Sequence, residues 1–182
     1  MEQVEHPMSQ STTISVVDLA HFTTDDQKGQ VLSWLHDLAL DLRPEDLAEI
    51  AASSGEDPLT ALIASVFASL CGFIVMHDDN PVCVFGAQPV PGMEADAGIA
   101  WMLGSPTMDK PSVARAILRQ TGDYVARLHA HFPLLWNWVD ARNTKSRAWL
   151  RWAGFSIISA DPNHGLESRL FYQFARKEAR HV

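Results

Sequence analysis

The sequence predicts a single α/β domain, because of the chain length, the apolar content and the order of the apolar segments. The chain has 182 residues, 47% of them hydrophobic, which is enough for one sizeable core. Short apolar runs of strand length alternate with segments whose apolar residues recur at helical spacing. The predicted order is one strand, three helices, three strands, one helix, one strand, one helix and two strands.

Three helices follow the first predicted strand, which covers residues 14–19. The first helix, roughly residues 27–40, comes after hydroxyl and acidic residues that can cap it. The other two begin at Pro44 and Pro58, since proline is favoured in a first helical turn, where its missing N–H has no partner. Gly55 ends the second helix, and the third runs to about Ser69.

The middle of the chain predicts an antiparallel hairpin, with strands at residues 71–76 and 82–88. The Asp, Asn and Pro residues between them favour a tight turn. Residues 59–76 are largely apolar, but they change near Leu70 from Ala- and Leu-rich to β-branched and aromatic. That change indicates a buried helix followed by a buried strand, so we expect no membrane span.

The last part of the chain predicts a strand, a short helix and a glycine at its end. After a loop, a strand is expected at residues 97–103, a long helix at 112–131 and a strand at 134–139. Asn143 or Thr144 can then cap a short helix, which Gly154 ends, where a left-handed conformation is needed. Two strands complete the chain, at residues 155–158 and 170–174.

This closing segment resembles the one in the GNAT (GCN5-related N-acetyltransferase) superfamily. That superfamily typically has an Asn after the fifth strand, then a short helix and Gly-Phe, at the spacing of Asn143 and Gly154-Phe155. The resemblance implies a mixed, mostly antiparallel central sheet flanked by helices. It also implies that strands four and five splay apart, and that acetyl-CoA places its pantetheine arm in the gap and gives its acyl group to an amine.

A narrower resemblance is to the GNAT-like proteins of tailed bacteriophages, similar to the internal virion protein A of T7-like phages. It depends on five pieces taken in order: Arg43-Pro44-Glu45-Asp46, Asp57-Pro58-Leu59, Val84-Phe85-Gly86, Trp101-Met102-Leu103-Gly104 and Asp140-Ala141-Arg142-Asn143. The resemblance implies phage or host proteins as partners. It also implies the host cytoplasm as the location, with the virion as a second one.

The resemblance also implies which residues contact acetyl-CoA: Trp101, Met102, Leu103, Ser105, Lys110, Ser112 and Asn143. The loop after Gly104 nevertheless departs from the family pattern, in which glycines let the backbone close around the pyrophosphate. No glycine follows Gly104, and Pro106 and Pro111 each remove an N–H. Asp109 adds a negative charge. We therefore expect acetyl-CoA to bind weakly or not at all.

Asp140, Asn143 and Ser146 are the candidate catalytic residues. Asp140 ends the fifth strand, where its carboxylate can hold an amine or a water, or can pair with a neighbouring arginine. Asn143 can serve the site or only cap the helix. The family often has a proton-donating Tyr where this chain has Leu150, which cannot donate. Ser146 is a weak substitute, or a packing residue.

Composition and charge argue against several other classes of function. The formal net charge of -8 argues against general nucleic-acid binding, which needs clustered Lys and Arg. The two cysteines, Cys71 and Cys83, are too few for a disulfide framework and indicate a reducing compartment. The histidines show no metal-ligand spacing, so we expect no metal. The expected layout is a tail at residues 1–12, a domain at 13–176 and a tail at 177–182.

Two functions remain open at this point. The first is a phage protein with a degenerate acyl-CoA site that acts in virion assembly or as an internal virion protein. The departures at the phosphate loop and at Leu150 favour it. The second is an acetyl-CoA-dependent N-acyltransferase that modifies a host protein or a small amine. The spacing from Asn143 to Gly154-Phe155 and the position of Asp140 favour it.

Overall fold

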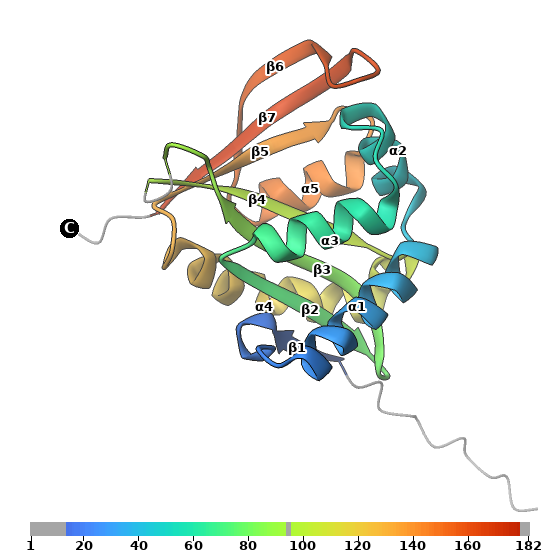
Figure 1. The fold of residues 1–182 in the computed structure, drawn as a ribbon. Helices are drawn as coiled ribbons and strands as arrows, with labels where there is room; N and C mark the ends of the chain where they lie inside the picture. The colour runs from blue at the N-terminus through green and yellow to red at the C-terminus, as the bar shows by residue number, and fades with distance from the viewer. Residues whose placement is uncertain (1–13, 94–95, 179–182) are drawn as a thin grey trace, which may run out of the picture.

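The computed structural model describes residues 14–93 and 96–178 (Figure 1). The predicted tail at residues 1–12 lies outside the described residues. The last strand runs through Lys177, one residue past the predicted end of the domain, and residues 179–182 are not described.

Seven strands form one sheet in the order β1-β2-β3-β4-β5-β7-β6. All neighbours are antiparallel except β4 and β5, which are parallel, so the predicted mixed and mostly antiparallel sheet is confirmed. The strands are β1 (Ile14–Asp18), β2 (Cys71–His77), β3 (Asn80–Pro89), β4 (Ala97–Gly104), β5 (Leu134–Asp140), β6 (Ser156–His164) and β7 (Arg169–Lys177).

The helices occur in the predicted order along the chain. They are α1 (Asp25–Leu40), α2 (Pro44–Ser53), α3 (Pro58–Ala68), α4 (Pro111–His129) and α5 (Thr144–Trp152). Helix α1 begins two residues before its predicted start, because Thr24 and Gln27 form a capping box in which each side chain bonds the other's backbone N–H. Helices α2 and α3 begin at their prolines, as predicted.

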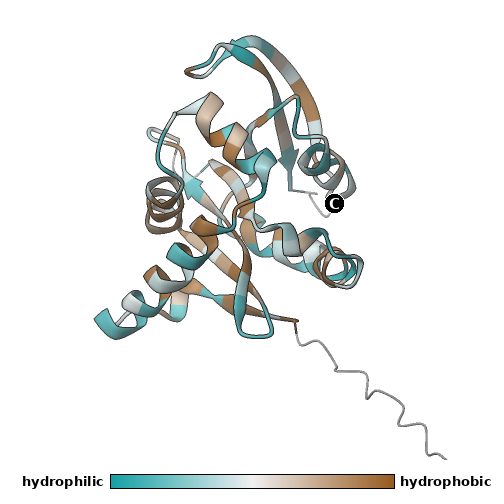
Figure 2. Cartoon of the chain, turned by 90° about the vertical axis from the view of Figure 1, so that its right-hand side faces the viewer, coloured by the Kyte–Doolittle hydropathy of each residue, from teal (hydrophilic) through white to brown (hydrophobic). Residues whose placement is uncertain are grey.

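Helices cover both faces of the sheet, as the two views show (Figures 1 and 2). Alternate residues of β2 point to opposite faces. Ile74 packs with α1, α2 and α3, whereas Phe73 packs with α4 and α5. The apolar stretch at residues 59–76 is therefore a helix followed by a buried strand, as predicted. Among the described residues, no helix combines the length and the apolar character needed to span a bilayer.

Strands β4 and β5 pair along only part of their length. The paired residues are Ala97 with Leu134, Gly98 with Leu135, and Ile99 with Trp136. Just beyond them, the Asn137 side-chain Nδ2 donates a hydrogen bond to the Ala100 carbonyl oxygen at 3.1 Å. Past that contact the two strands separate, so the predicted gap between strands four and five is present.

Gly154 ends α5 in the left-handed region, with φ of +84°, as the sequence predicts. We expect Gly154→Ala to lower the free energy of unfolding by about 1 kcal/mol or more, because an alanine is strained at this φ. An added Cβ would meet Arg176 only at ordinary contact distance, so the backbone and not crowding causes the loss. The measurement is urea denaturation.

Gly122, in the middle of α4, is the matched control for this prediction. An added Cβ there meets nothing within 4 Å, and alanine is favoured over glycine in a helix by about 1 kcal/mol. Gly122→Ala should therefore stabilise the protein. If both variants change the free energy of unfolding in the same direction, the left-handed conformation at Gly154 does not account for the effect.

Candidate active site

A cavity of about 110 Å³ lies in the gap between β4 and β5. Its walls come from both strands, from α4 and α5, and from one residue of α2, Glu49. Residues of β1, β2, β3 and β7 on the α4 face of the sheet complete the lining. Trp101, Trp138 and Trp149 are part of the lining, so these indoles line the gap without filling it. The site therefore lies where the GNAT resemblance places the acyl donor.

The backbone of β4 faces this cavity at Met102. Residues of an antiparallel strand direct their peptide groups alternately to one neighbour and the other. The Ser105 N–H bonds the Val82 carbonyl of the β3 side, and the Ala100 carbonyl accepts from Asn137 on the β5 side. By that alternation, the peptide N–H and C=O of Met102 face the gap, and β5 has already diverged there.

Glu49 supplies the acidic side chain in the lining of the cavity, and no sequence pattern placed it there. Its Oε2 accepts a hydrogen bond from Asn143 Nδ2 at 2.9 Å. Burial raises the pKa of Glu49 to about 7, and the nearby Asp46 carboxylate adds to the rise, while the Asn143 hydrogen bond opposes it. A carboxyl with that pKa is divided between its acid and base forms near neutral pH, as a general base requires.

Asn143 both caps α5 and contacts a residue of the cavity, two roles that the sequence left as alternatives. Its Oδ1 accepts from the Ser146 N–H at 3.1 Å, which caps α5. Its Nδ2 donates to Glu49 and, at 3.4 Å, to Asp46 Oδ1. The side chain is 2% exposed, so its orientation is fixed by these contacts. Asn143 therefore positions the Glu49 carboxylate as well as the helix.

Asp140 is paired with a neighbouring arginine, one of its two predicted alternatives. It accepts hydrogen bonds from Arg142 N at 2.8 Å and from Arg142 Nε at 3.0 Å. Burial alone would raise the pKa of Asp140, but the Arg142 hydrogen bonds outweigh it and the pKa is lowered. Asp140 is not among the residues that line the cavity. A paired carboxylate of low pKa is a weak base.

Ser146 and Tyr124 are the candidate proton donors in the lining of the cavity. Leu150 lines it, at the position where the family often has a Tyr, and Ser146 lines it as well. Tyr124 of α4, which no sequence pattern places near the gap, also lines the cavity, and its ring centroid lies 5.0 Å from that of Phe73. Burial raises the pKa of Tyr124, so its hydroxyl stays protonated at neutral pH. Tyr124 recurs at helical spacing with the apolar residues Val125 and Leu128 of α4, and that spacing was the available signal.

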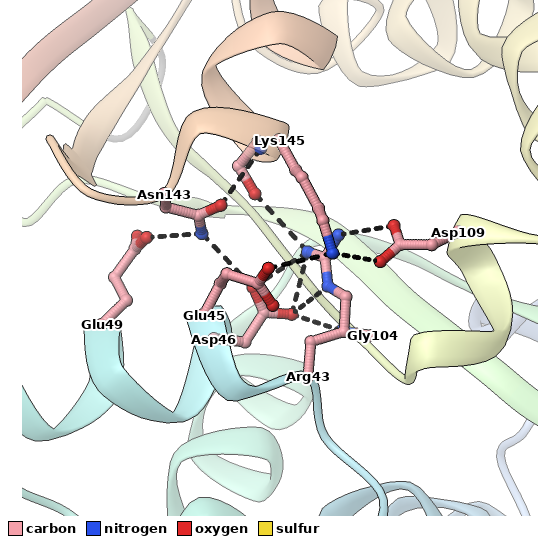
Figure 3. A network of polar contacts seen from close by, with 9 residues as sticks. Arg43, Glu45, Asp46, Glu49, Gly104, Asp109, Asn143 and Lys145 are labelled. Atoms are coloured by element: carbon pink, nitrogen blue, oxygen red, sulfur yellow. Dashed lines mark hydrogen bonds and ion pairs between the residues drawn. The ribbon is translucent and has the colours of Figure 1, made fainter.

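A buried ion pair holds α2 against the end of β4 (Figure 3). Arg43 Nε and Nη2 donate to the two Asp46 carboxylate oxygens at 3.1 and 2.9 Å, and both side chains are almost fully buried. Asp46 also accepts from the Gly104 N–H at 2.9 Å, and the Arg43 N–H donates to the Gly104 carbonyl at 2.9 Å. The start of α2 thus pairs with the β4 edge that β5 has left.

Lys145 of α5 extends these contacts toward solvent. Its Nζ lies 2.7 Å from Asp109 Oδ2 and 2.9 Å from Glu45 Oε1, and the hydrogen bond from Lys145 lowers the pKa of Glu45. These contacts join the loop after β4 to α5 and α2. We call the side chains drawn here the polar network: Arg43, Glu45, Asp46, Glu49, Asp109, Asn143 and Lys145 (Figure 3).

The loop after β4 offers little to a pyrophosphate. It forms a 3-10 turn, Pro106–Asp109, in which the Met108 N–H bonds the Ser105 carbonyl and the Lys110 N–H bonds the Thr107 carbonyl. These N–H groups are therefore occupied by the loop itself. The acidic Asp109 faces Lys145 and Arg43.

The predicted acetyl-CoA contacts do not gather at one place in the structure. Trp101 and Met102 line the cavity. Leu103 packs in the layer of α1, α2 and α3, and Ser112 is exposed in the first turn of α4. Ser105 and Lys110 line a separate hollow with Asp37 and Asp41 of α1.

A second cavity of about 280 Å³ lies between the loop after β4 and helices α4 and α5. It shares Met102, Ile117 and Trp149 with the first cavity. The two cavities are therefore neighbours, with these three side chains between them. Within residues 14–93 and 96–178, no three His, Cys, Asp or Glu side chains gather as a metal site would need.

Comparisons with known proteins identify solved structures with the same fold. No family model and no curated protein matches the chain. An acetyltransferase of the GNAT family from Streptococcus pneumoniae superposes with a TM-score of 0.60 at 11% identity, covering 92% of this chain and 100% of the other. The ribosomal-protein-S18-alanine N-acetyltransferase from Escherichia coli gives a TM-score of 0.61 at 13% identity, with 93% and 99% covered.

A third solved structure is YncA from Salmonella typhimurium with its cofactor acetyl-CoA. It gives a TM-score of 0.62 at 10% identity, with 93% of this chain and 96% of the other covered. Identities this low show the fold alone. The chain therefore has the fold of the GNAT acetyltransferases.

Proposed function

We propose that the protein is an N-acyltransferase that takes its acyl group from a coenzyme A thioester. The observation that carries the proposal is Glu49, a carboxyl of pKa about 7 on the cavity between the splayed strands. The alternation along β4 supports it, because the Met102 N–H faces the same cavity. A general base and an oxyanion donor on one cavity are what acyl transfer to an amine requires.

The residues that line the cavity then have distinct roles in the proposed acyl transfer. The bound thioester supplies an activated acyl carbon. Met102 N–H would hold the carbonyl oxygen of that thioester, and Glu49 would take a proton from the acceptor amine. Asn143 fixes the Glu49 carboxylate. Tyr124 would give a proton to the departing sulfur, with Ser146 as the alternative donor. The residues fit the acyl end of the donor better than its pyrophosphate end.

A second candidate is a non-catalytic role in virion assembly, which the phage resemblance suggests. Two observations favour it. The loop after β4 uses its own N–H groups, and Asp109 places a carboxylate, paired with Lys145, where a pyrophosphate would need donors. Leu150 also leaves the usual donor position without a hydroxyl. Under this candidate the partners are phage or host proteins.

Mass-shift detection of acetylated amines separates the two candidates. Wild type and Glu49→Gln would be incubated with acetyl-CoA and three kinds of acceptor: peptides with a free amino terminus, lysine peptides and an aminoglycoside. Transfer by wild type that disappears in Glu49→Gln supports the enzyme. Absence of transfer to every acceptor, with folding intact, supports the assembly role.

We expect acetyl-CoA to bind wild type with a dissociation constant of about 100 µM or weaker, a binding free energy of roughly -5 kcal/mol. The reason is the shortage of free backbone donors between Gly104 and Ser112. Calorimetry at millimolar ligand measures it, with Lys110→Ala as the control, since Lys110 lies away from the gap. Low-micromolar binding that Lys110→Ala abolishes would contradict this account of the loop.

A further inference from the structure

The cavity between β4 and β5 continues beneath α4 toward the β1 edge of the sheet. Met102 of β4 lies directly opposite Phe85 of β3, and Val75 of β2 lies directly opposite Val16 of β1. All four side chains line the cavity. Since neighbouring strands lie about 4.8 Å apart, the lining crosses about 14 Å of sheet from β4 to β1. It therefore extends well past the point where the Met102 N–H would hold a thioester carbonyl.

The sheet side of this extension consists of hydrocarbon. Every residue that β1, β2 and β3 contribute to the lining is apolar: Ile14, Val16, Val75 and Phe85. On the α4 side, Ile117 and Val125 are apolar, and the Thr121 hydroxyl already donates to the Ile117 carbonyl oxygen at 2.9 Å. Burial of methylene groups is favourable there, whereas a charged group would lose its hydration.

The volume of the cavity is larger than an acetyl group needs. Protein interiors are close-packed, and a space left between apolar side chains lowers stability in proportion to its volume. The cavity measures about 110 Å³. An engineered apolar cavity of about 150 Å³ takes benzene, with its six carbons, so on the same scale this cavity takes about four carbons. An acetyl group has two.

We propose that the acyl group is longer than acetyl, with about four carbons, and that its hydrocarbon tail lies between α4 and strands β1 to β3. This inference rests on the proposed acyltransferase function and names its donor class, the short-chain acyl thioesters of coenzyme A. The amine nitrogen forms the amide C–N bond and the thioester C–S bond breaks. Glu49 takes the amine proton, and the sulfur leaves as a thiol with a proton from Tyr124 or Ser146.

A competition experiment measures the preference directly. Wild type is given an equimolar mixture of acetyl-, butyryl- and hexanoyl-CoA with each of the three kinds of acceptor. The masses of the amide products then give the ratios of kcat/KM. Each buried methylene contributes about fourfold, so the butyryl product should exceed the acetyl product by about 10-fold. Hexanoyl should bring no further gain, because its last two carbons exceed the volume.

Two substitutions at Val16 change the volume in opposite directions. Val16→Phe places a ring in the extension and should lower the butyryl-to-acetyl ratio by about 10-fold, because it removes the space for two methylenes. Val16→Ala enlarges the extension and should raise the hexanoyl-to-butyryl ratio. Val17→Phe is the matched control, since Val17 points to the opposite face and packs with the layer of α1, α2 and α3. It should leave both ratios unchanged.

The outcomes separate this inference from the proposed function. If wild type transfers no acyl group from any of the three thioesters, the proposed function fails and this inference with it. If acetyl is transferred at least as well as butyryl, only the inference fails. Melting temperatures show which variants fold, and Val16→Ala carries the test alone if Val16→Phe does not. Ratios that stay the same in a folded Val16 variant would overturn the placement of the tail.

Discussion

Replacing Glu49 with glutamine should lower the rate of amine acylation by about 100- to 10,000-fold, the range that general base catalysis supplies. Glutamine keeps the size of the side chain and can still accept from Asn143, but it cannot take a proton. Steady-state acylation of the best acceptor amine measures the effect. Glu45→Gln, one turn earlier on α2 and outside the cavity lining, should keep most of the activity.

The pH dependence gives the same prediction a second readout. Burial raises the pKa of Glu49 to about 7, so its base form, and with it the rate of wild type, should increase as the pH rises through about 7. The increase should be absent from the residual activity of Glu49→Gln. A wild-type rate that stays flat between pH 6 and pH 8 would mean that a group other than Glu49 is the general base.

The stability of Glu49→Gln provides a test that does not depend on activity. The folded pKa of Glu49 lies above its ordinary value of 4.5, so the folded state holds the proton more tightly than the unfolded chain. Stability is therefore lost as the pH rises from about 4.5 to about 7, where the buried carboxylate must ionise. Glu49→Gln avoids that loss. Its free energy of unfolding should exceed that of wild type at pH 8, and the difference should be much smaller at pH 4.

Asp46→Ala should lower the free energy of unfolding by about 3–5 kcal/mol, because it leaves the Arg43 guanidinium buried without its main partner. Asp46 also satisfies the Gly104 N–H at the edge of β4, so the loss includes a backbone hydrogen bond. Urea denaturation measures the effect.

Glu45→Ala is the control for Asp46→Ala. Glu45 also pairs with a cation, Lys145, but that lysine side chain is 51% exposed, and exposed pairs contribute about 0–1 kcal/mol. Replacing Arg43 and Asp46 together with apolar residues of similar size should recover much of the loss. If Asp46→Ala and Glu45→Ala destabilise equally, the buried pair does not hold α2 to the sheet.

The fold was largely predictable from the sequence. Apolar spacing, prolines at helix starts and Gly154 at a helix end are local signals, and the structure agrees with each of them. The ends of helices and strands differ from the prediction by a few residues where they depend on contacts with distant parts of the chain. Strand β6 was expected to end at residue 158, but it runs to His164 because it pairs with β7.

The site was less predictable, because it depends on contacts between distant segments. Asn143 was identified from its spacing to Gly154, but its partner Glu49 lies 94 residues earlier, and no local pattern links the two. Asp46 follows Pro44 at the start of α2 and is an ordinary acid of a first helical turn by sequence. Only the packing of α2 on β4 makes it the buried partner of Arg43.

The partial pairing of β4 with β5 has a consequence for how such a site can change over evolution. One end of the gap is set by the main-chain pairing of β4 with β5 at Ala97, Gly98 and Ile99. Gly98 has to stay small there, because an added Cβ would meet the Phe132 ring at 2.5 Å. The other end is set by the polar network, which depends entirely on side-chain identity (Figure 3). Substitutions at that second end can therefore alter the width of the gap while the strand register stays the same. Under the proposed function, acceptor preference could therefore diverge without a change of fold.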